Sequence, residues 1–223
     1  MIISMIAAID KNNAIGVNND IPWRIPSDFK WFKQYTMGKI IVMGYNTFMS
    51  LPGLLPGRPH FIFTNRTNIS EIQNRVNAFK DKHGVSKLPI VAVCSGMEEF
   101  LRNMDSAFEN SEEVCVIGGG QIYQLFMPFA NKLVLTHVDT SVKDPDVFFP
   151  TIDHDKWNVL ENIAVNKQEE ADQHPFSTII YQRKDALVYS LIEKKYLSKI
   201  EKVALATGVD LNLDLYGSDP DIA

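Results

Sequence analysis

The sequence lacks several features that define other classes of protein. Its 223 residues include only two cysteines, Cys94 and Cys115, each inside an apolar run. We expect buried free thiols, because a disulfide framework or a metal site needs more, or closer, ligands. The five histidines show no metal-ligand spacing, so we expect no bound metal. No apolar run approaches the roughly 18 residues of a transmembrane helix.

Positive charge is also scarce. Acidic residues outnumber basic ones by 27 to 22, and the formal net charge is -5. This mildly acidic balance gives no electrostatic reason to expect nucleic acid or an anionic membrane as a partner. The apolar start of the chain, residues 1–9, has no basic flank and runs directly into Asp10 and Lys11. It favours a buried strand over a signal peptide, and we expect a cytoplasmic protein.

The chain instead carries short β-branched runs that alternate with helix-like stretches. Strands are expected at 2–9, 39–43, 60–64, 89–94, 113–117, 132–138, 157–166 and 177–183, and helices at 27–36, 46–50, 69–82, 97–104, 120–127 and 187–206. This alternation predicts an α/β fold with a central, mostly parallel sheet. The early strands are apolar almost throughout, as expected when both sheet faces are covered. The last two strands follow each other without a helix, which allows an antiparallel hairpin at a sheet edge.

One helix-like stretch carries a lone carboxylate among aromatic side chains. At about 100° per residue, Asp28 shares a face of the helix with Trp31, Phe32 and Tyr35. The plain interpretation is that Asp28 complements the helix dipole in the first turn. The alternative is that an aromatic pocket desolvates the carboxylate and raises its pKa, which suits proton transfer to a bound heterocycle. We favour the second, because the preceding Asn- and Gly-rich loop, residues 10–23, resembles the lids that flank such pockets.

Glycines and polar groups follow several expected strands. The glycine triplet 118–120 joins a strand to a helix, where backbone N–H groups can bind phosphate. A tight structural turn is equally compatible, since Tyr123 stands where the dinucleotide fingerprint needs its third glycine. Gly44 and the run 64–66 follow two further strands, and ligands of open α/β sheets lie at such carboxyl ends.

Arg58 follows Pro56 and Gly57 in a turn-dense segment just before an expected strand. A guanidinium held by a rigid turn suits a carboxylate on a ligand. A solvated surface arginine fits the same pattern, so both interpretations stay open from the residues alone.

Taken in order, these segments resemble the dihydrofolate reductase family. The matching motifs are Ile15-Gly16 with Pro22-Trp23, Pro26-x-Asp28-x-x-Trp31-Phe32, Val42-Met43-Gly44-x-x-Thr47-Phe48-x-Ser50-Leu51, Leu55-Pro56-Gly57-Arg58, Ile117-Gly118-Gly119-Gly120-x-Ile122-Tyr123 and Leu135-Thr136-His137. Each motif alone is weak, but this many in one order are specific. The resemblance makes residues 1–184 a catalytic domain of the dihydrofolate-reductase-like fold, with helices on both faces of the sheet, and leaves 185–223 as a C-terminal extension. An aspartate at position 28 looks like the bacterial and viral branch.

The resemblance implies an enzyme that transfers a hydride from NADPH to the pterin ring of dihydrofolate, giving tetrahydrofolate. Asp28 would bind the amino-pyrimidine edge of the pterin and promote protonation of its imine nitrogen. Thr136 would hydrogen-bond this carboxylate, and Trp23 would hold an ordered water nearby. The implied substrate-binding residues, with Arg58 as the clamp on the glutamate carboxylate, are Ile6, Ala8, Asp28, Phe29, Phe32, Ser50, Leu55, Arg58, Ile117 and Tyr123.

The resemblance also implies where NADPH binds. The cofactor-binding residues would be Ala8, Ile15, Gly16, Gly44, Tyr45, Asn46, Thr47, Thr64, Asn65, Arg66, Gly118, Gly119, Gly120, Gln121 and Ile122. A cis peptide bond between Gly118 and Gly119 belongs to the family pattern. Tyr45 stands where the family usually has arginine or lysine near the 2′-phosphate, and Arg66 can supply the missing cation. We therefore expect the chain to prefer NADPH to NADH, but by a smaller margin than the usual family pattern would give.

One further residue and two segments of the chain depart from the family pattern. Phe29 stands where leucine is common and adds bulk beside the pterin. The stretch from Arg66 to Pro89 is longer than in compact bacterial members, which would enlarge the adenosine side. Residues 187–206 place apolar side chains at helical spacing with charges between them, and residues 214–223 look frayed. This helix would pack on the enzyme's own body or, as a sharper hypothesis, bind a second copy or another protein.

Two other functions remain compatible with the sequence. A reductase of another pterin or of a pyrimidine metabolite would keep the hydride chemistry, although Arg58 favours folate because it needs a carboxylate to bind. An assembly or binding protein could keep the reductase fold and use the extension for interaction. The matching catalytic constellation argues against lost activity.

Overall fold

An eight-stranded mixed sheet forms the centre of the molecule. The structure, a computed structural model, describes residues 2–84, 88–107, 113–163 and 170–184. The strand order is β5-β4-β3-β6-β1-β7-β10-β9. The strands are β1 (Ile2–Ile9), β3 (Ile40–Gly44), β4 (His60–Phe63), β5 (Val91–Cys94), β6 (Glu113–Val116), β7 (Lys132–Val138), β9 (Trp157–Ile163) and β10 (Phe176–Arg183). Neighbours from β5 to β7 pair in parallel, whereas β10 pairs antiparallel with both β7 and β9.

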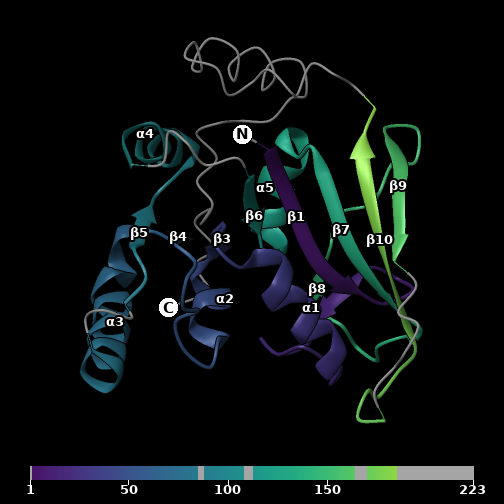
Figure 1. Ribbon diagram of the computed structural model, residues 1–223, viewed down its shortest axis with the longest axis horizontal. Coiled ribbons are helices and arrows are strands. Elements are labelled where there is room, and N and C mark those ends of the chain that lie inside the picture. The colour runs from purple at the N-terminus through teal and green to yellow at the C-terminus, as the bar shows by residue number, and fades with distance from the viewer. Residues whose placement is uncertain (1, 85–87, 108–112, 164–169, 185–223) are drawn as a thin grey trace.

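Helices cover both faces of this sheet. They are α1 (Pro26–Thr36), α2 (Tyr45–Ser50), α3 (Ile69–His83), α4 (Met97–Ala107) and α5 (Gly120–Phe126). Figure 1 shows α3 and α4 at the β5 end of the sheet, with β9 and β10 at the opposite end. The sequence prediction of a mostly parallel α/β sheet with helices on both faces is confirmed.

The two-residue period of β3 divides its side chains between two apolar clusters. Ile40 and Val42 are buried in a cluster with residues of α4 and α5, including Phe100 and Phe126. Ile41 and Met43 are buried on the other face, in a cluster to which α1, α2 and α3 contribute. A strand buried on both faces reads as a continuous apolar run, which is how the sequence of β3 reads.

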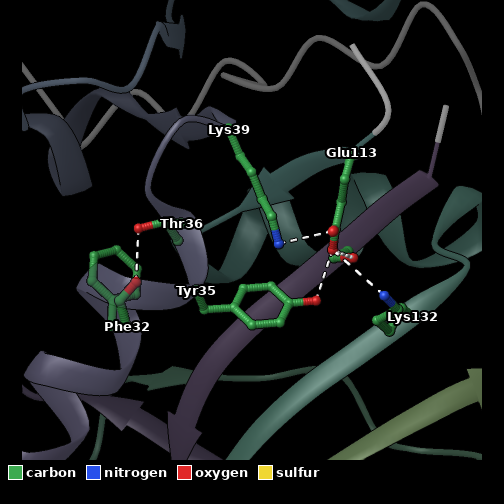
Figure 2. Close-up of polar contacts among 7 residues, drawn as sticks. Phe32, Tyr35, Thr36, Lys39, Glu113 and Lys132 are labelled. Carbon is green, nitrogen blue, oxygen red and sulfur yellow. Dashed lines mark hydrogen bonds and ion pairs between the residues drawn. The ribbon is translucent and has the colours of Figure 1, made fainter.

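A partly buried ionic cluster lies at the amino ends of the central strands. The Glu113 carboxylate, at the start of β6, accepts a hydrogen bond from the Tyr35 hydroxyl (2.7 Å) and pairs with Lys39 (2.8 Å) and Lys132 (3.7 Å), as Figure 2 shows. It also accepts a hydrogen bond from the Ser4 hydroxyl. Only 14% of the Glu113 side chain is exposed. Because Tyr35 belongs to α1, this cluster fixes the last turn of α1 to β1, β6 and β7 and to the residue before β3.

Most predicted elements agree with the structure to within a few residues. The antiparallel hairpin is confirmed as β9 and β10, with β9 at the edge. The sequence analysis missed a second, two-stranded sheet of β2 (Ala14–Gly16) and β8 (Val147–Phe148). Strands this short show no periodicity of their own. Residues 164–166 of one expected strand, and the whole extension from 185, lie outside the described residues. Among the described helices, none has the length and apolar character to cross a membrane.

Candidate active site

A cleft of about 1110 Å³ opens at the carboxyl ends of β1, β3 and β6. One wall is α1 and the loop that precedes it, and the other is formed by α2 and the turn into α5. The predicted site residues that line it are Ile6, Ala8, Ile15, Gly16, Trp23, Asp28, Phe29, Phe32, Gly44, Tyr45, Asn46, Thr47, Ser50, Ile117, Gly118, Gly119, Gly120, Gln121, Ile122 and Tyr123. Parts of the chain that are far apart in sequence therefore meet on one concave surface.

Asp28 is the half-buried carboxylate of this cleft. It lies in the first turn of α1, where the fixed backbone of Pro26 suits the start of a helix. The Thr136 hydroxyl, from the middle of β7, donates to Asp28 Oδ1 at 2.6 Å. Thr136 Oγ1 also lies 3.1 Å from Thr178 Oγ1 of β10. Because Thr136 has a single hydroxyl proton, which it gives to Asp28, the Thr178 hydroxyl donates to Thr136. Two strands thus fix the orientation of the carboxylate.

The surroundings of Asp28 disfavour its charged form. Burial raises the pKa of Asp28 above its ordinary value, the Thr136 hydrogen bond lowers it in part, and the negative charge of Asp172 raises it again. The Asp172 carboxylate accepts a hydrogen bond from the backbone N–H of Ser27 at 3.0 Å. A carboxyl group whose pKa is raised is able to hold a proton closer to neutral pH and to exchange it with a ligand.

Aromatic side chains surround this carboxylate. Phe29 and Phe32 of α1 line the cleft, and 49% of Phe29 is exposed there. Trp23 is buried at 6% exposure and lines the cleft from the loop before α1. The buried Tyr123 hydroxyl donates to the carbonyl of Ile6 at 2.6 Å, and burial and then the charge of Asp28 raise its pKa. The result is an apolar slot beside the Asp28 carboxylate, which suits a flat heterocycle.

The glycine triplet leaves bare backbone on the opposite wall. The peptide bond between Gly118 and Gly119 is cis, as the resemblance implied. The Gly44 N–H donates to the Gly118 carbonyl at 2.8 Å, which fixes the turn to the end of β3. A Cβ on Gly119 would lie 3.3 Å from Thr47 Oγ1, and one on Gly120 would lie 3.2 Å from the Phe148 carbonyl. A side chain at either position would have to displace its neighbour by a few tenths of an ångström, and the glycines leave backbone groups to line the cleft.

The loop over the cleft is tied down at several points. The buried carboxylate of Asp10 accepts hydrogen bonds from the N–H groups of Asn12, Ala14 and Val142, all between 2.7 and 2.8 Å. Farther along, the Asn18 N–H donates to Asp146 Oδ2 at 2.8 Å, beside the β2–β8 pair. The first half of the loop is therefore held by two carboxylates, Asp10 and Asp146, that accept hydrogen bonds from its backbone N–H groups.

Five predicted site residues with described side chains do not line the cleft. Thr136 lies behind Asp28, as its expected role requires. Leu55, Arg58, Thr64 and Asn65 lie outside the lining, and the side chain of Arg66 is not among those described. Arg58 is only 3% exposed, and its guanidinium donates to Thr36 Oγ1 (3.2 Å) and to the Pro56 carbonyl (3.3 Å). The roles expected of these residues toward ligands stay predictions.

The sequence analysis also missed residues that the structure brings to the cleft. Asp146, Val147 and Phe148 line it from β8 and the turn before it, and Gln173 lines it from the loop before β10. The Gln173 side chain accepts a hydrogen bond from the Arg24 N–H at 2.7 Å. The Asp-Pro-Asp turn at 144–146 was the only signal for β8 in the sequence. Among the described residues, no group of three His, Cys, Asp or Glu side chains has the geometry of a metal site.

Known proteins match this chain over most of its length. A family model described as dihydrofolate reductase matches residues 2–183. The dihydrofolate reductase of Staphylococcus haemolyticus is 33% identical over 186 residues, which cover 81% of this chain and 95% of that protein. The dihydrofolate reductase of Neisseria meningitidis serogroup A is 37% identical over 175 residues, which cover 78% and 94%.

A solved structure is similar in fold. It is described as dihydrofolate reductase from Enterococcus faecalis complexed with NADP(H) and RAB-propyl, and it has a TM-score of 0.63 at 23% identity. The match covers 82% of this chain and 97% of the other.

Proposed function

The chain belongs to the dihydrofolate reductase family, and from that premise we propose that Asp28 binds the substrate and promotes its protonation. The activity of the chain is the NADPH-dependent reduction of dihydrofolate to tetrahydrofolate. The observation behind the residue assignment is the position of Asp28, a half-buried carboxylate on the cleft whose Oδ1 is held by Thr136 at 2.6 Å.

Asp28 is proposed to accept hydrogen bonds from the amino-pyrimidine edge of the pterin. The imine nitrogen of the pterin must gain a proton when the neighbouring carbon is reduced. Because burial raises the pKa of Asp28, its protonated form is accessible nearer to neutral pH than that of an exposed aspartate. Trp23 and the loop around it would exclude bulk water and keep an ordered water beside the carboxylate, and Phe32 would stack on the ring.

The residues along the opposite wall fit a dinucleotide. NADPH supplies the hydride when it is bound. Gly44 and the glycine triplet present backbone at positions where a Cβ would meet Ile122 (3.1 Å from Gly44) or Thr47 (3.3 Å from Gly119). Asn46, Thr47 and Gln121 add polar side chains to the same wall. This part of the cleft would hold the pyrophosphate and ribose groups, while Ala8, Ile15 and Gly16 would border the nicotinamide.

The test of this function is a steady-state assay with dihydrofolate and either NADPH or NADH. We expect turnover with both, a lower KM for NADPH, and a rise in the KM for dihydrofolate in Arg58→Leu if that guanidinium binds the glutamate tail. Purified protein that binds NADPH but reduces no dihydrofolate would refute the proposal. An unchanged KM in Arg58→Leu would refute only the assignment of Arg58 as the residue that binds the glutamate tail.

Partners and location follow the same premise. The family implies the binding of dihydrofolate and NADPH. A protein partner or a second copy bound through residues 187–206, and a cytoplasmic location, stay predictions. The division into a catalytic domain of residues 1–184 and an extension of residues 185–223 is likewise a proposal.

A further inference from the structure

Two side chains of α3 contact opposite ends of the short helix α2. The hydroxyl of Tyr45, the first residue of α2, donates a hydrogen bond to the Glu71 carboxylate. At the other end, the Arg75 guanidinium donates to the backbone carbonyls of Met49 (3.1 Å) and Leu51. Glu71 and Arg75 are one helical turn apart, so they share one face of α3. This face therefore holds α2 at both ends.

The same spacing elsewhere in the molecule forms an ordinary surface pair. On α4, Glu98 and Arg102 stand in the same order at the same separation, and they bond each other at 3.0 Å. Both side chains of that pair are largely exposed, Glu98 at 71% and Arg102 at 70%. Such pairs contribute only a few tenths of a kcal/mol to a helix. On α3 the equivalent side chains instead reach a second helix.

The helix α2 needs external support. It has six residues and no side-chain cap at its amino end. Isolated helices shorter than about 12 residues are marginal, and the last carbonyls of any helix lack partners within the helix. Arg75 supplies donors to two of these carbonyls, and its guanidinium carbon lies 5.3 Å from the ring centroid of the fully buried Phe48. One side chain therefore fixes both the polar end and the apolar face of α2.

The position of α2 sets the width of the cleft. Tyr45, Asn46, Thr47 and Ser50 line it from α2, beside the glycine triplet on the wall that faces α1. The approach is close, because a Cβ built on Gly119 would lie only 3.3 Å from the Thr47 hydroxyl. A small displacement of α2 would change the contacts that a ligand makes with both walls.

We propose that α3 positions α2 for the cofactor, with Arg75 as the main positioning residue and the Tyr45–Glu71 hydrogen bond as a second support. This inference rests on the proposed function, because it needs NADPH to lie along α2. It gives a role to the long stretch that follows Arg66, most of which forms α3 (Figure 1). Loss of the support is expected to weaken cofactor binding while leaving the chemistry at Asp28 intact.

The experiment measures the Kd for NADPH, by quenching of tryptophan fluorescence, together with kcat and the melting temperature. Arg75→Met keeps the aliphatic length and removes the donors, and we expect the Kd to rise about tenfold, as for a lost hydrogen bond from a charged donor. Arg75→Lys keeps one donor and is expected to restore part of this loss. Glu71→Met removes the acceptor of the Tyr45 hydroxyl from outside the cleft lining and is expected to raise the Kd about threefold. The kcat at saturating NADPH is expected to stay within about twofold throughout.

Arg102→Met, which breaks the matched pair on α4, is the control and is expected to leave the Kd unchanged. A wild-type Kd in Arg75→Met overturns the proposal, and so does a variant that lowers only the melting temperature, because Arg75 would then act on stability alone. If the wild-type protein binds NADPH but does not reduce dihydrofolate, the proposed function fails while the Kd comparison still decides the role of α3. If the wild-type protein does not bind NADPH, both fail.

Discussion

The Asp28 carboxylate lies where its charge opposes folding. Burial raises its pKa, so the folded protein binds a proton more tightly than the unfolded chain does. Any stability linked to this group is present below the ordinary aspartate range and is lost as the pH rises through the higher pKa of the folded state. At neutral pH the ionised carboxylate therefore costs folding free energy, which an enzyme tolerates at a residue that it uses.

Asp28→Asn separates these two effects. We expect turnover at neutral pH to fall about 10²-fold or more, as for loss of a group that assists proton transfer, with partial recovery at low pH where the substrate is itself protonated. We also expect the free energy of unfolding at pH 7 to rise, by about 0.5–2 kcal/mol. Chemical denaturation and steady-state kinetics on the same preparation check both. Wild-type turnover at pH 7 would exclude Asp28 as the group that promotes protonation.

Thr136→Val tests the partner of this carboxylate. The Thr136 hydrogen bond lowers the pKa of Asp28, so its loss should raise that pKa further. We expect the alkaline limb of the pH–rate profile to move to higher pH by about one unit, since a hydrogen bond to a charged group is worth roughly 1.5 kcal/mol or more.

Thr178→Val is the matched control, because it removes the neighbouring hydroxyl and leaves the Thr136–Asp28 bond in place. It should move the limb much less. A limb that moves to lower pH in Thr136→Val, or equal shifts in both variants, would show that Thr136 does not tune Asp28.

At the scale of the elements, α1 is fixed at both of its ends. Asp28 and Ser27 hold its first turn to β7 and to the loop before β10, and Tyr35 holds its last turn to Glu113. Burial alone would raise the pKa of Glu113, but hydrogen bonds from Lys39, Ser4 and Tyr35, with the charge of Lys132, hold it below its ordinary value of 4.5. The folded state therefore stabilises the charged form of this carboxylate.

Glu113→Gln should lower the free energy of unfolding at pH 7 by roughly 1–2 kcal/mol, at the low end for charged hydrogen bonds because part of the site faces water. The pKa in the folded state is depressed, so the stabilisation is fully present above the ordinary glutamate range and is lost as the pH falls through the folded pKa. The difference between wild type and variant should thus shrink as the pH falls below 4.5.

Urea denaturation between pH 7 and pH 3 measures this difference. Glu98→Gln on α4 is the control, because its exposed pair with Arg102 should contribute little at any pH. A difference that stays constant with pH would mean that Glu113 acts through packing rather than through its charge.

The elements of this fold were largely predictable, and their tertiary contacts were not. The strands β1, β3 and β6 can be recognised in the sequence as apolar runs, because both of their faces are buried. The burial of Arg58 could not be predicted from the sequence. Its hydrogen-bond partner Thr36 lies 22 residues away in α1, and nothing in the pattern of either segment indicates that the two side chains meet. Likewise, the sequence identifies Asp10 and Asp146 only as loop residues. The backbone N–H groups that donate hydrogen bonds to their carboxylates are brought near them only in the folded chain.

At the scale of the whole molecule, the position of the cleft follows from the parallel order of the sheet. The carboxyl ends of β1, β3 and β6 must share one edge, so Ala8, Gly44 and the glycine triplet converge there although more than a hundred residues separate the first from the last. That convergence is the part of the site that the sequence predicted best. The part contributed by β8 comes from a strand of two residues, which is too short to show a period. The support that α3 gives to α2 comes from side-chain contacts that the helical pattern of residues 69–82 does not specify.

Several contacts hold residues 183 and 184 to the rest of the fold, which allows the proposed domain boundary to be tested. The Arg183 guanidinium donates to the carbonyls of Ala130 (2.6 Å) and Met127 and lies 4.4 Å from the Trp157 ring centroid. The Lys184 N–H donates to the Lys156 carbonyl at 2.9 Å. These contacts join the end of β10 to β9 and to the segment after α5, and the family match ends at residue 183.

A chain of residues 1–184 should therefore fold and reduce dihydrofolate with the kcat and both KM values of the full chain. A chain of residues 1–182 is the matched control: it loses the Arg183 contacts and should be less stable by about 2–4 kcal/mol, because several hydrogen bonds and a cation–π contact are lost together. Thermal denaturation and steady-state kinetics compare the three chains. If 1–184 is as unstable as 1–182, residues 185–223 pack on the catalytic domain; if 1–184 matches the full chain in both measurements, the extension is free for a partner, and its oligomeric state is the next quantity to measure.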